Sequence, residues 1–283
     1  MAGRPARRRS DDGATLGTAD WEREFDRWLA PFWEALGDAR RRRWAPVYVR
    51  GLLGPGDRKS VEPLAARVAP GDYGQLYHFV NAATWEGGPL ERVLAEKAQA
   101  LVGGPDAVLI VDDTTLPKQG RYSVGVARQC SGAAGKRANC QALVSLTLAR
   151  GEVPVALALR LFLPDEWTAA PARCRAAGVP DDRIPPRTKV EIALDEVDRV
   201  RAVGVTFGCM LADAGYGASA EFRRARSARG LTWAVGITRA QTVDPADVAL
   251  HWPRAATGRP RTHPAPTHER EAADDVLAGE RWR

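Results

Sequence analysis

The chain has 283 residues, which suggests one or two domains, and its 45% of hydrophobic and 27% of charged residues are typical of a globular protein. Its longest apolar stretches, 142–149 and 153–163, are too short to span a bilayer, so a membrane protein is excluded and we expect a cytoplasmic one. The formal net charge of +6 favours an anionic partner, nucleic acid first, although the arginine bias of a GC-rich genome explains it equally well.

The N-terminal third predicts helices. Residues 1–18 are basic and poor in apolar anchors, which indicates a disordered lead-in. Over 19–102 apolar residues recur at three- and four-residue steps, as in Trp21, Phe25 and Trp28, and Gly54-Pro55-Gly56 interrupts the pattern. We expect residues 19–102 to form a helical N-terminal domain and a candidate for DNA binding.

The pattern of apolar residues changes after residue 103. Short apolar runs predict strands, and longer periodic runs predict helices. The predicted strands are 107–111, 122–127, 142–148, 153–162, 207–212 and 233–237; the predicted helices are 189–203 and 218–229. Between them we expect a loop over 132–137 and an irregular stretch over 161–186.

The predicted elements over 103–243 follow the order strand, antiparallel strands, helix, strand, helix, strand. This order indicates a mixed α/β layer and is similar to that of RNase H-like nucleases, although other α/β folds share it. From residue 244 to 283 prolines punctuate a polar segment, which predicts an irregular tail.

Aspartates follow two of the predicted buried strands. Asp112 and Asp113 end the first, and Asp213 ends a later one. Carboxylates at such strand ends face the crevice where α/β sheets bind ligands, and a pair of them suits Mg²⁺ and phosphodiester chemistry. On spacing alone, turn-capping aspartates are the commoner case. Because side chains alternate along a strand, only one of Asp112 and Asp113 faces the metal, and periodicity does not say which.

Two basic segments are candidates for phosphate contacts. One follows the first aspartates in the sequence and comprises Lys118, Arg128, Lys136 and Arg137; a solvated loop explains it equally well. The other is the predicted helix 218–229, where Arg223 and Arg226 share a face that suits either a DNA backbone or water.

Several motifs, in one order from about Trp21 to Ile237, resemble the IS701 family of bacterial insertion-sequence transposases, which is close to the IS4 group. The motifs are Val111-Asp-Asp-Thr-Thr-Leu-Pro-Lys-Gln-Gly120, Ser123-Val-Gly-Val-Ala-Arg-Gln129, Gly135-Lys-Arg-Ala-Asn-Cys-Gln141, Leu163-Pro-Asp-Glu-Trp167, Arg173-Cys-Arg-Ala-Ala-Gly-Val-Pro180, Arg187-Thr-Lys189 and Leu211-Ala-Asp-Ala-Gly-Tyr-Gly217.

The resemblance implies an RNase H-like core that cuts and rejoins double-stranded DNA with Mg²⁺ or Mn²⁺. Carried over residue by residue, it makes Asp113 and Asp213 the catalytic and metal-binding acids, and it is the resemblance that favours Asp113 over Asp112. It also implies insertion-sequence ends and target DNA as partners, a homodimer in a synaptic complex, and association with the nucleoid when bound to DNA.

The sequence departs from the family where the third acid is expected. The family's catalytic Glu lies in a segment resembling Arg-Trp-x-Ile-Glu after a further strand, and this chain has no such segment. Glu269, Glu271 and Glu280 lie in or beyond the proline-rich tail. We therefore expect a truncated copy that does not catalyse transposition. The alternatives are a non-catalytic DNA-binding remnant, which binds element ends or interferes with an intact transposase, and a nuclease outside transposition.

Overall fold

The computed structural model describes residues 18–82, 86–131, 135–245, 247–252 and 263–279. The chain divides into two compact units, Met1–Leu94 and Ala95–Arg283. The division falls inside helix α5 (Gly88–Val102), whereas the sequence predicts a boundary after residue 102. The predicted lead-in lies outside the described residues, apart from Thr18.

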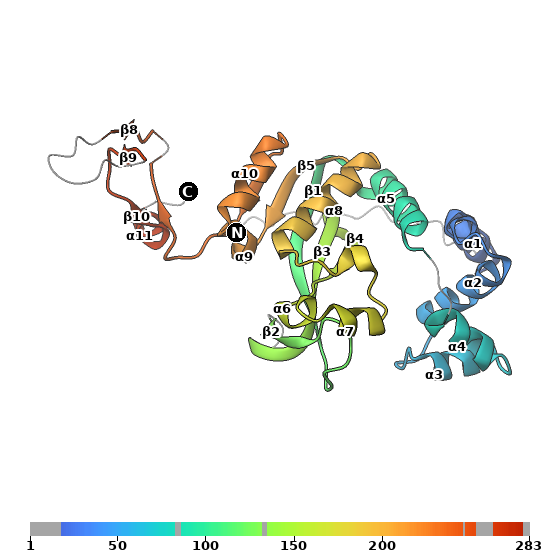
Figure 1. The fold of residues 1–283 in the computed structure, drawn as a ribbon. Coiled ribbons are helices and arrows are strands. Elements are labelled where there is room, and N and C mark those ends of the chain that lie inside the picture. Colours follow the sequence, from blue (N-terminus) through green and yellow to red (C-terminus); the bar gives the residue numbers. More distant parts are fainter. Residues whose placement is uncertain (1–17, 83–85, 132–134, 246, 253–262, 280–283) are drawn as a thin grey trace, which may run out of the picture. The chain divides into compact units, whose positions relative to one another are not determined.

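The first unit is helical, as the apolar periodicity predicts. Its helices are α1 (Thr18–Ala35), α2 (Ala39–Leu53), α3 (Val61–Val68), α4 (Tyr73–Asn81) and the first part of α5 (Figure 1). Their core is built on Trp44, Leu64, Leu76 and Phe79, all 6% exposed or less. Trp21 lies on α1 as predicted, but its side chain is half exposed, so helical spacing alone did not identify the packed face.

The second unit is built on one sheet with the strand order β2-β3-β1-β5-β6, in which β4 also pairs with β3 (Figure 1). β1 is antiparallel to β3 and parallel to β5, and β5 is parallel to β6. A central first strand between an antiparallel half and a parallel half is the arrangement of an RNase H-like core, which confirms the predicted fold class. The strands are β1 (Gly104–Pro117), β2 (Ala127–Ser131), β3 (Lys136–Arg150), β4 (Val153–Leu161), β5 (Phe207–Ala212) and β6 (Trp233–Val235).

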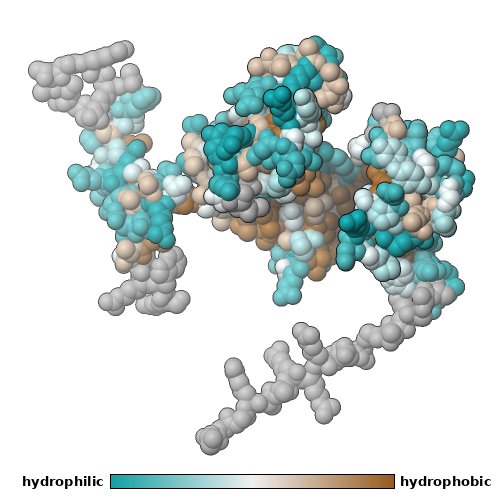
Figure 2. Space-filling model, turned by 90° about the horizontal axis from the view of Figure 1, so that it is seen from below, coloured by the Kyte–Doolittle hydropathy of each residue, from teal (hydrophilic) through white to brown (hydrophobic). Residues whose placement is uncertain are grey.

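Helices cover one face of this sheet, and the other face is partly exposed. Helix α8 (Lys189–Ala202) packs on β3 and β4, and α10 (Ala220–Ala228) packs beside α8, so the sheet residues on that face are buried. The opposite face carries apolar residues that stay partly exposed, among them Leu116, Leu159 and Leu211. Figure 2 shows apolar surface of this unit in brown near the centre of the picture.

The predicted strand over 122–127 is wrong. Gly125 adopts a left-handed φ of 73°, and the amide of Val126 bonds the carbonyl of Ser123 at 3.2 Å, so the segment turns back before β2 begins. A Cβ on Gly125 would also lie 3.1 Å from the carbonyl oxygen of Phe162, a contact that only glycine avoids without displacement.

Other boundaries also differ from the predictions. Lys136 and Arg137 are not in a loop but begin β3, while 132–134 lie outside the described residues. The stretch predicted to be irregular contains short helices, and the tail contains short paired strands and a helix. The elements of the stretch are α6 (Asp165–Thr168), α7 (Pro171–Ala176) and the 3₁₀ turn η1 (Asp181–Arg183). Those of the tail are β8 (Leu250–His251), β9 (Ala265–Pro266), β10 (Glu271–Ala272) and α11 (Ala273–Gly279), and β7 (Thr242–Val243) lies just before it. A further short helix, α9 (Ala214–Gly217), follows β5.

Helix α6 and its neighbours form a small core of their own. Trp167 is fully buried there with Cys174, and its indole N–H donates to the carbonyl of Val126 at 2.9 Å. The guanidinium of Arg173 lies 3.8 Å from the centre of the Trp167 ring. These contacts hold the segment that precedes β2. Among the described residues, no helix is long and apolar enough to cross a membrane.

Candidate active site at the ends of strands β1 and β5

The two aspartate motifs lie on neighbouring parallel strands. Val111 of β1 pairs with Ala212 of β5, so Asp113 and Asp213 follow this pair at the same end of the sheet. Asp113 alternates with Val111 and Leu109 on the buried face, whereas the side chain of Asp112 is exposed. The structure therefore separates the two adjacent aspartates by face and turns Asp113 toward the helix-covered side.

Both carboxylate oxygens of Asp113 accept hydrogen bonds from side chains far away in the sequence. The phenol of Tyr216 donates to Oδ1 at 2.7 Å, and the ammonium of Lys189 forms a short ion pair with Oδ2. Lys189 is the first residue of α8, and its ammonium lies 5.4 Å from the centre of the Phe162 ring. Asp113 is thus a half-buried carboxylate fixed from two directions, with a cation already beside it.

Asp213 caps the short helix α9. Its Oδ1 accepts the amide hydrogens of Gly215 at 3.0 Å and Tyr216 at 3.2 Å. Within the part of the chain that the structure describes, Oδ2 has no hydrogen-bond partner, and the side chain is exposed. Asp213 can therefore both cap α9 and bind a metal, because Oδ1 accepts the capping hydrogen bonds and Oδ2 is available as a metal ligand.

Tyr216 connects the two aspartates. Its backbone amide bonds Asp213 and its hydroxyl bonds Asp113. Burial, followed by the nearby charge of Asp113, raises the pKa of the Tyr216 hydroxyl above its ordinary value, and the charges of Asp213 and Asp112 act in the same direction. The hydroxyl thus remains protonated and serves as a donor. Because both carboxylates act on this one hydroxyl, the two motifs face a common region.

A glycine allows the motif that contains Asp213 to lie close to the end of β6. A Cβ on Gly217 would lie 1.9 Å from the carbonyl oxygen of Gly236, which follows β6. The amide of Gly236 also bonds the carbonyl of Ala212 at 2.9 Å. Only glycine permits this close approach, so Gly217 allows α9 to pack against the end of β6 and hold Asp213 beside β1.

The predicted basic residues near Asp113 gather around the start of β3. Arg128 pairs with Asn139, and Cys130 pairs with Arg137, so Arg128 and Arg137 share one face of the β2–β3 hairpin while Lys136 lies on the other. The side-chain amide of Asn139 donates to the carbonyl of Lys118 at 2.8 Å. Lys118 lies about 16 Å of extended chain beyond Asp113, so these residues are not part of the carboxylate cluster.

The prediction that Arg226 faces DNA is wrong, because its side chain has no exposed surface. Its guanidinium lies between the rings of Phe222, at 3.9 Å, and Trp233, at 4.4 Å, and burial lowers the pKa of Arg226 to about 10. Its two terminal nitrogens have no hydrogen-bond partner among the described residues. Arg223 is half-buried and donates to the carbonyl of Gly217, so it supports the second aspartate motif.

Sequence reasoning missed Lys189 and Tyr216 as members of the site. Both lie in motifs that the resemblance singled out, yet neither motif gives a reason to place them at Asp113, which is 76 residues away from Lys189. In the described part of the chain, no group of three or more His, Cys, Asp or Glu side chains is arranged to hold a metal ion.

Comparison with known proteins agrees with this architecture. A family model described as DDE superfamily endonuclease matches residues 31–283. A curated relative, "Probable transposase for insertion sequence element IS701" from Microchaete diplosiphon, is 26% identical over 169 residues, which are 60% of this chain and 41% of the relative. The matched part thus spans less than half the length of that relative. The match to the family model, which covers most of the chain, shows that this protein belongs to the DDE superfamily endonucleases.

Proposed function

We propose that the protein derives from a DNA transposase and that Asp113 and Asp213 are the metal-binding acids of its DNA-processing site. The observation that carries this proposal is the placement of both acids after paired residues of adjacent parallel strands, with Tyr216 bonded to each. Its family membership and its similarity to an insertion-sequence transposase support DNA as the substrate.

The donor set suits Mg²⁺ or Mn²⁺. Mg²⁺ takes oxygen ligands, commonly one or two protein carboxylates completed by water and substrate phosphate. Asp113 offers a carboxylate that already attracts a cation, the ammonium of Lys189, and Asp213 offers Oδ2. When bound, such a metal activates a water or a 3′-hydroxyl and stabilises the leaving oxygen of the phosphodiester. Tyr216 stays protonated and holds Asp113 in place by donating a hydrogen bond to it.

We further propose that the two acids alone do not complete strand transfer. Catalysis at a metal pair requires a fixed coordination geometry, and a third carboxylate contributes both charge and spacing. Glu269 and Glu271 lie among the described residues of the tail, in and just before β10, but no contact places them at Asp113. Glu280 lies outside the described residues. From the described residues we infer that the site binds metal and DNA without giving a joined product.

One observation favours a second candidate, a non-catalytic DNA-binding protein. Lys189 and Tyr216 occupy both oxygens of Asp113, so the carboxylate is neutralised without a metal. In that case the core holds DNA as a structural scaffold and interferes with an intact transposase at the element ends.

The experiment that tests the proposed function measures DNA binding with and without metal. Purified protein is titrated with duplex DNA carrying the ends of the parent element, in EDTA and in Mn²⁺, and the products are analysed for cleavage and joining. We expect Mn²⁺ to tighten binding in the wild type and not in Asp113→Asn or Asp213→Asn, and we expect no joined products.

Two results would contradict this account. If Mn²⁺ affects both asparagine variants as it affects the wild type, the metal does not bind at these aspartates. If the wild type gives joined products that disappear in Glu269→Ala or Glu271→Ala, a glutamate of the tail supplies the third acid and the chain is a working enzyme.

A further inference from the structure

The β1–β2 loop, residues 118–126, is held in place through its backbone. Six of its carbonyls, those of residues 118, 120, 121, 124, 125 and 126, accept hydrogen bonds from side chains outside the loop. Asn139 donates two of these bonds, at 2.8 and 2.9 Å, and four other side chains donate one each, at 2.7 to 3.3 Å; they are Gln129, Gln141, Trp167 and Arg173. The loop therefore has a fixed backbone although it belongs to no strand or helix.

The same contacts leave an aromatic side chain of the loop exposed, because they end on main-chain oxygens. Tyr122 is 81% exposed, the largest fraction among the exposed large hydrophobic side chains of the described residues. The guanidinium of Arg121 lies over its ring, 5.7 Å from the ring centre. A ring on a fixed backbone loses little conformational entropy when it binds, so the loop is pre-organised for a contact.

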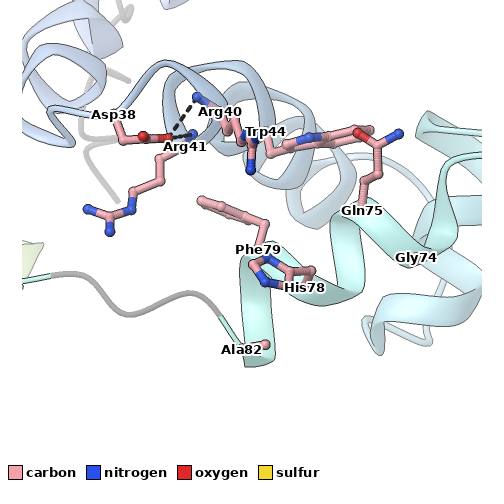
Figure 3. A pocket seen from close by; sticks show the side chains of 9 residues that line it. All are labelled: Asp38, Arg40, Arg41, Trp44, Gly74, Gln75, His78, Phe79 and Ala82. Atoms are coloured by element: carbon pink, nitrogen blue, oxygen red, sulfur yellow. Dashed lines mark hydrogen bonds between the residues drawn. The ribbon is translucent and has the colours of Figure 1, made fainter.

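The aromatic rings that line the cavity of the helical unit are closed by contrast. This cavity, of about 790 Å³, lies between α2 and α4, and its rings, those of Trp44 and Phe79, are 6% and 5% exposed (Figure 3). Tyr73 and Tyr77 of α4 are 45% and 47% exposed and pack against each other, with ring centres 5.7 Å apart. Tyr122 is therefore better placed than these four rings to stack against a planar group.

The sequence around the β1–β2 loop is positively charged. From Thr114 to Gly151 the chain has no aspartate or glutamate and six lysines or arginines. Within the part of the chain that the structure describes, no carboxylate forms an ion pair with Lys118, Arg121 or Arg128. The loop therefore suits a partner that is both anionic and planar, and a nucleotide has both properties in its phosphate and its base.

We propose that the β1–β2 loop binds an unpaired nucleotide of the DNA, whose base stacks on the Tyr122 ring and whose phosphate contacts Arg121. Inside a duplex each base is covered on both faces by its neighbours, so a tyrosine ring stacks only on a base that has left the duplex or belongs to a single-stranded tail. The inference rests on the proposed function in that DNA is the partner, and it deepens that function by naming the form of DNA that is recognised.

The loop lies away from the proposed metal site. A strand advances about 3.3 Å per residue, so Lys118 lies about 16 Å along the chain from Asp113. The nucleotide at Tyr122 is therefore not the one whose phosphodiester faces the acids, and its binding can be measured without metal.

The experiment measures binding to the full chain in EDTA, with two DNAs of the same duplex sequence. One DNA is blunt, and the other carries a single-stranded tail that contains 2-aminopurine, whose fluorescence falls when the base stacks. The variants are Tyr122→Ala, Tyr122→Phe, which keeps the ring, and Arg121→Gln. Tyr77→Ala is the matched control, because it removes an exposed tyrosine from another part of the chain.

We expect the wild type to bind the tailed DNA about tenfold more tightly than the blunt DNA, which is the effect of one base stacked on an aromatic side chain. Tyr122→Ala should abolish both this preference and the fall in fluorescence, whereas Tyr122→Phe and Tyr77→Ala should keep both. Arg121→Gln should lower the slope of log affinity against log salt on the tailed DNA by roughly 0.7, and Tyr122→Ala should leave the slope unchanged, because only the arginine contacts a phosphate.

The inference is overturned if Tyr122→Ala keeps the preference for the tail or if Tyr77→Ala loses it as well. Loss of the preference in Tyr122→Phe would also overturn it, since stacking requires the ring and not the hydroxyl. If the wild type binds both DNAs equally, the inference fails alone. If it binds neither DNA, DNA is not the partner and the proposed function fails with it.

Discussion

The ammonium of Lys189, at the start of α8, forms an ion pair with Oδ2 of Asp113, at the end of the buried part of β1. The pair joins two elements that lie 76 residues apart and places a cation on the acid that we propose as a metal ligand. A metal at Asp113 therefore competes with a charge that the protein itself provides.

Removing that charge should strengthen metal binding. We expect Lys189→Ala to bind Mn²⁺ about tenfold more tightly than the wild type, since a unit charge about 4 Å away is worth roughly 1–4 kcal/mol at a protein surface. Lys189→Arg, which keeps the charge, is the control and should bind like the wild type. Calorimetric titration with Mn²⁺ measures both, and equal or weaker binding by Lys189→Ala would show that the ammonium does not compete.

Tyr216 should stabilise the fold through its hydroxyl. We expect Tyr216→Phe to lower the free energy of unfolding by about 1.5–3 kcal/mol, because a hydrogen bond to a charged carboxylate is lost in a buried position. Tyr122→Phe is the matched control, since the Tyr122 side chain is 81% exposed, and it should change stability by less than about 0.5 kcal/mol. Denaturant unfolding that shows equal changes in both variants would exclude this role for the Tyr216 hydroxyl.

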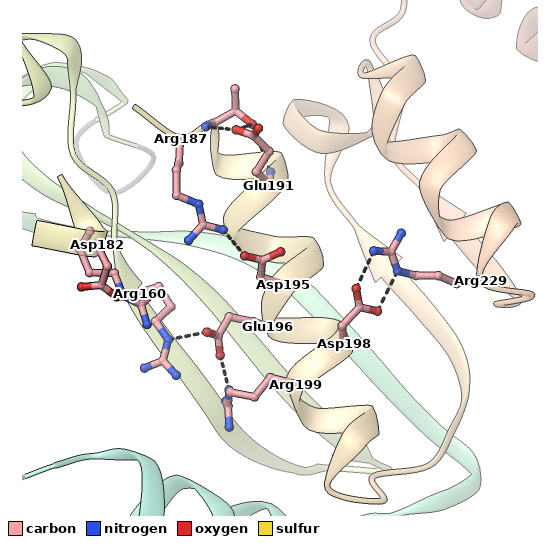
Figure 4. Close-up of polar contacts among 11 residues, drawn as sticks. Arg160, Asp182, Arg187, Glu191, Asp195, Glu196, Asp198, Arg199 and Arg229 are labelled. Atoms are coloured by element: carbon pink, nitrogen blue, oxygen red, sulfur yellow. Dashed lines mark hydrogen bonds and ion pairs between the residues drawn. The ribbon is translucent and has the colours of Figure 1, made fainter. Parts of the chain in front are cut away.

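A buried acid holds α8 to β4 (Figure 4). Glu196 of α8 is 7% exposed and accepts hydrogen bonds from Arg160 of β4 at 2.6 Å and from Arg199 at 2.7 Å. Glu196→Gln should destabilise the protein by about 2–4 kcal/mol, because two half-buried guanidinium groups lose their counter-charge. Glu221→Gln, at an exposed position of α10, should change little. A loss under about 1 kcal/mol for Glu196→Gln would contradict this account.

The ion pair between Asp198 of α8 and Arg229, which follows α10, should make the free energy of unfolding depend on pH. Arg229 forms two hydrogen bonds to Asp198, at 2.8 and 2.6 Å, and they hold the pKa of Asp198 below its ordinary value (Figure 4). A lowered pKa in the folded state means that the stabilisation is present above the pKa of the unfolded chain and is lost as the pH falls through the folded value. Asp198 is about half exposed, so the effect should be well under 1 kcal/mol.

The measurement for this prediction compares the free energy of unfolding at pH 7 and pH 3 in the wild type and in Asp198→Asn. The variant should lose less stability than the wild type between the two pH values, because its side chain does not titrate. An equal loss in both proteins would show that the pair does not contribute.

Much of the sheet was predictable because most of its strands contain a short apolar run. The runs over 107–111 and 207–212 fall in β1 and β5, and the periodic run over 189–203 is α8. Predictions from local patterns were wrong where tertiary contacts determine the backbone conformation. The segment 122–127 turns at Gly125 to meet Phe162, although its composition is typical of a strand. The tail was predicted to be irregular because of its prolines, and the short paired strands that it contains were therefore missed.

The site was predictable only in part. Strand ends pointed to Asp112, Asp113 and Asp213, and alternation could not choose between Asp112 and Asp113. The packing of α8 shows that Asp113 lies on the covered face, while its role as a metal ligand stays a prediction. Spacing on α10 placed Arg226 outside, because periodicity shows that residues share a face and not which face is buried. The partners of Asp113 are contacts between distant segments, which no local pattern contains.

The most direct test of the central claim is to map the metal on the protein. Fe²⁺ replaces Mg²⁺ in the full chain, ascorbate and peroxide are added, and the peptide fragments are identified by mass. The account predicts backbone cuts near both Asp113 and Asp213, which excess Mg²⁺ suppresses and which disappear together in Asp113→Asn. Cuts near only one of the two aspartates, or cuts at both that persist in Asp113→Asn, would contradict a shared metal site.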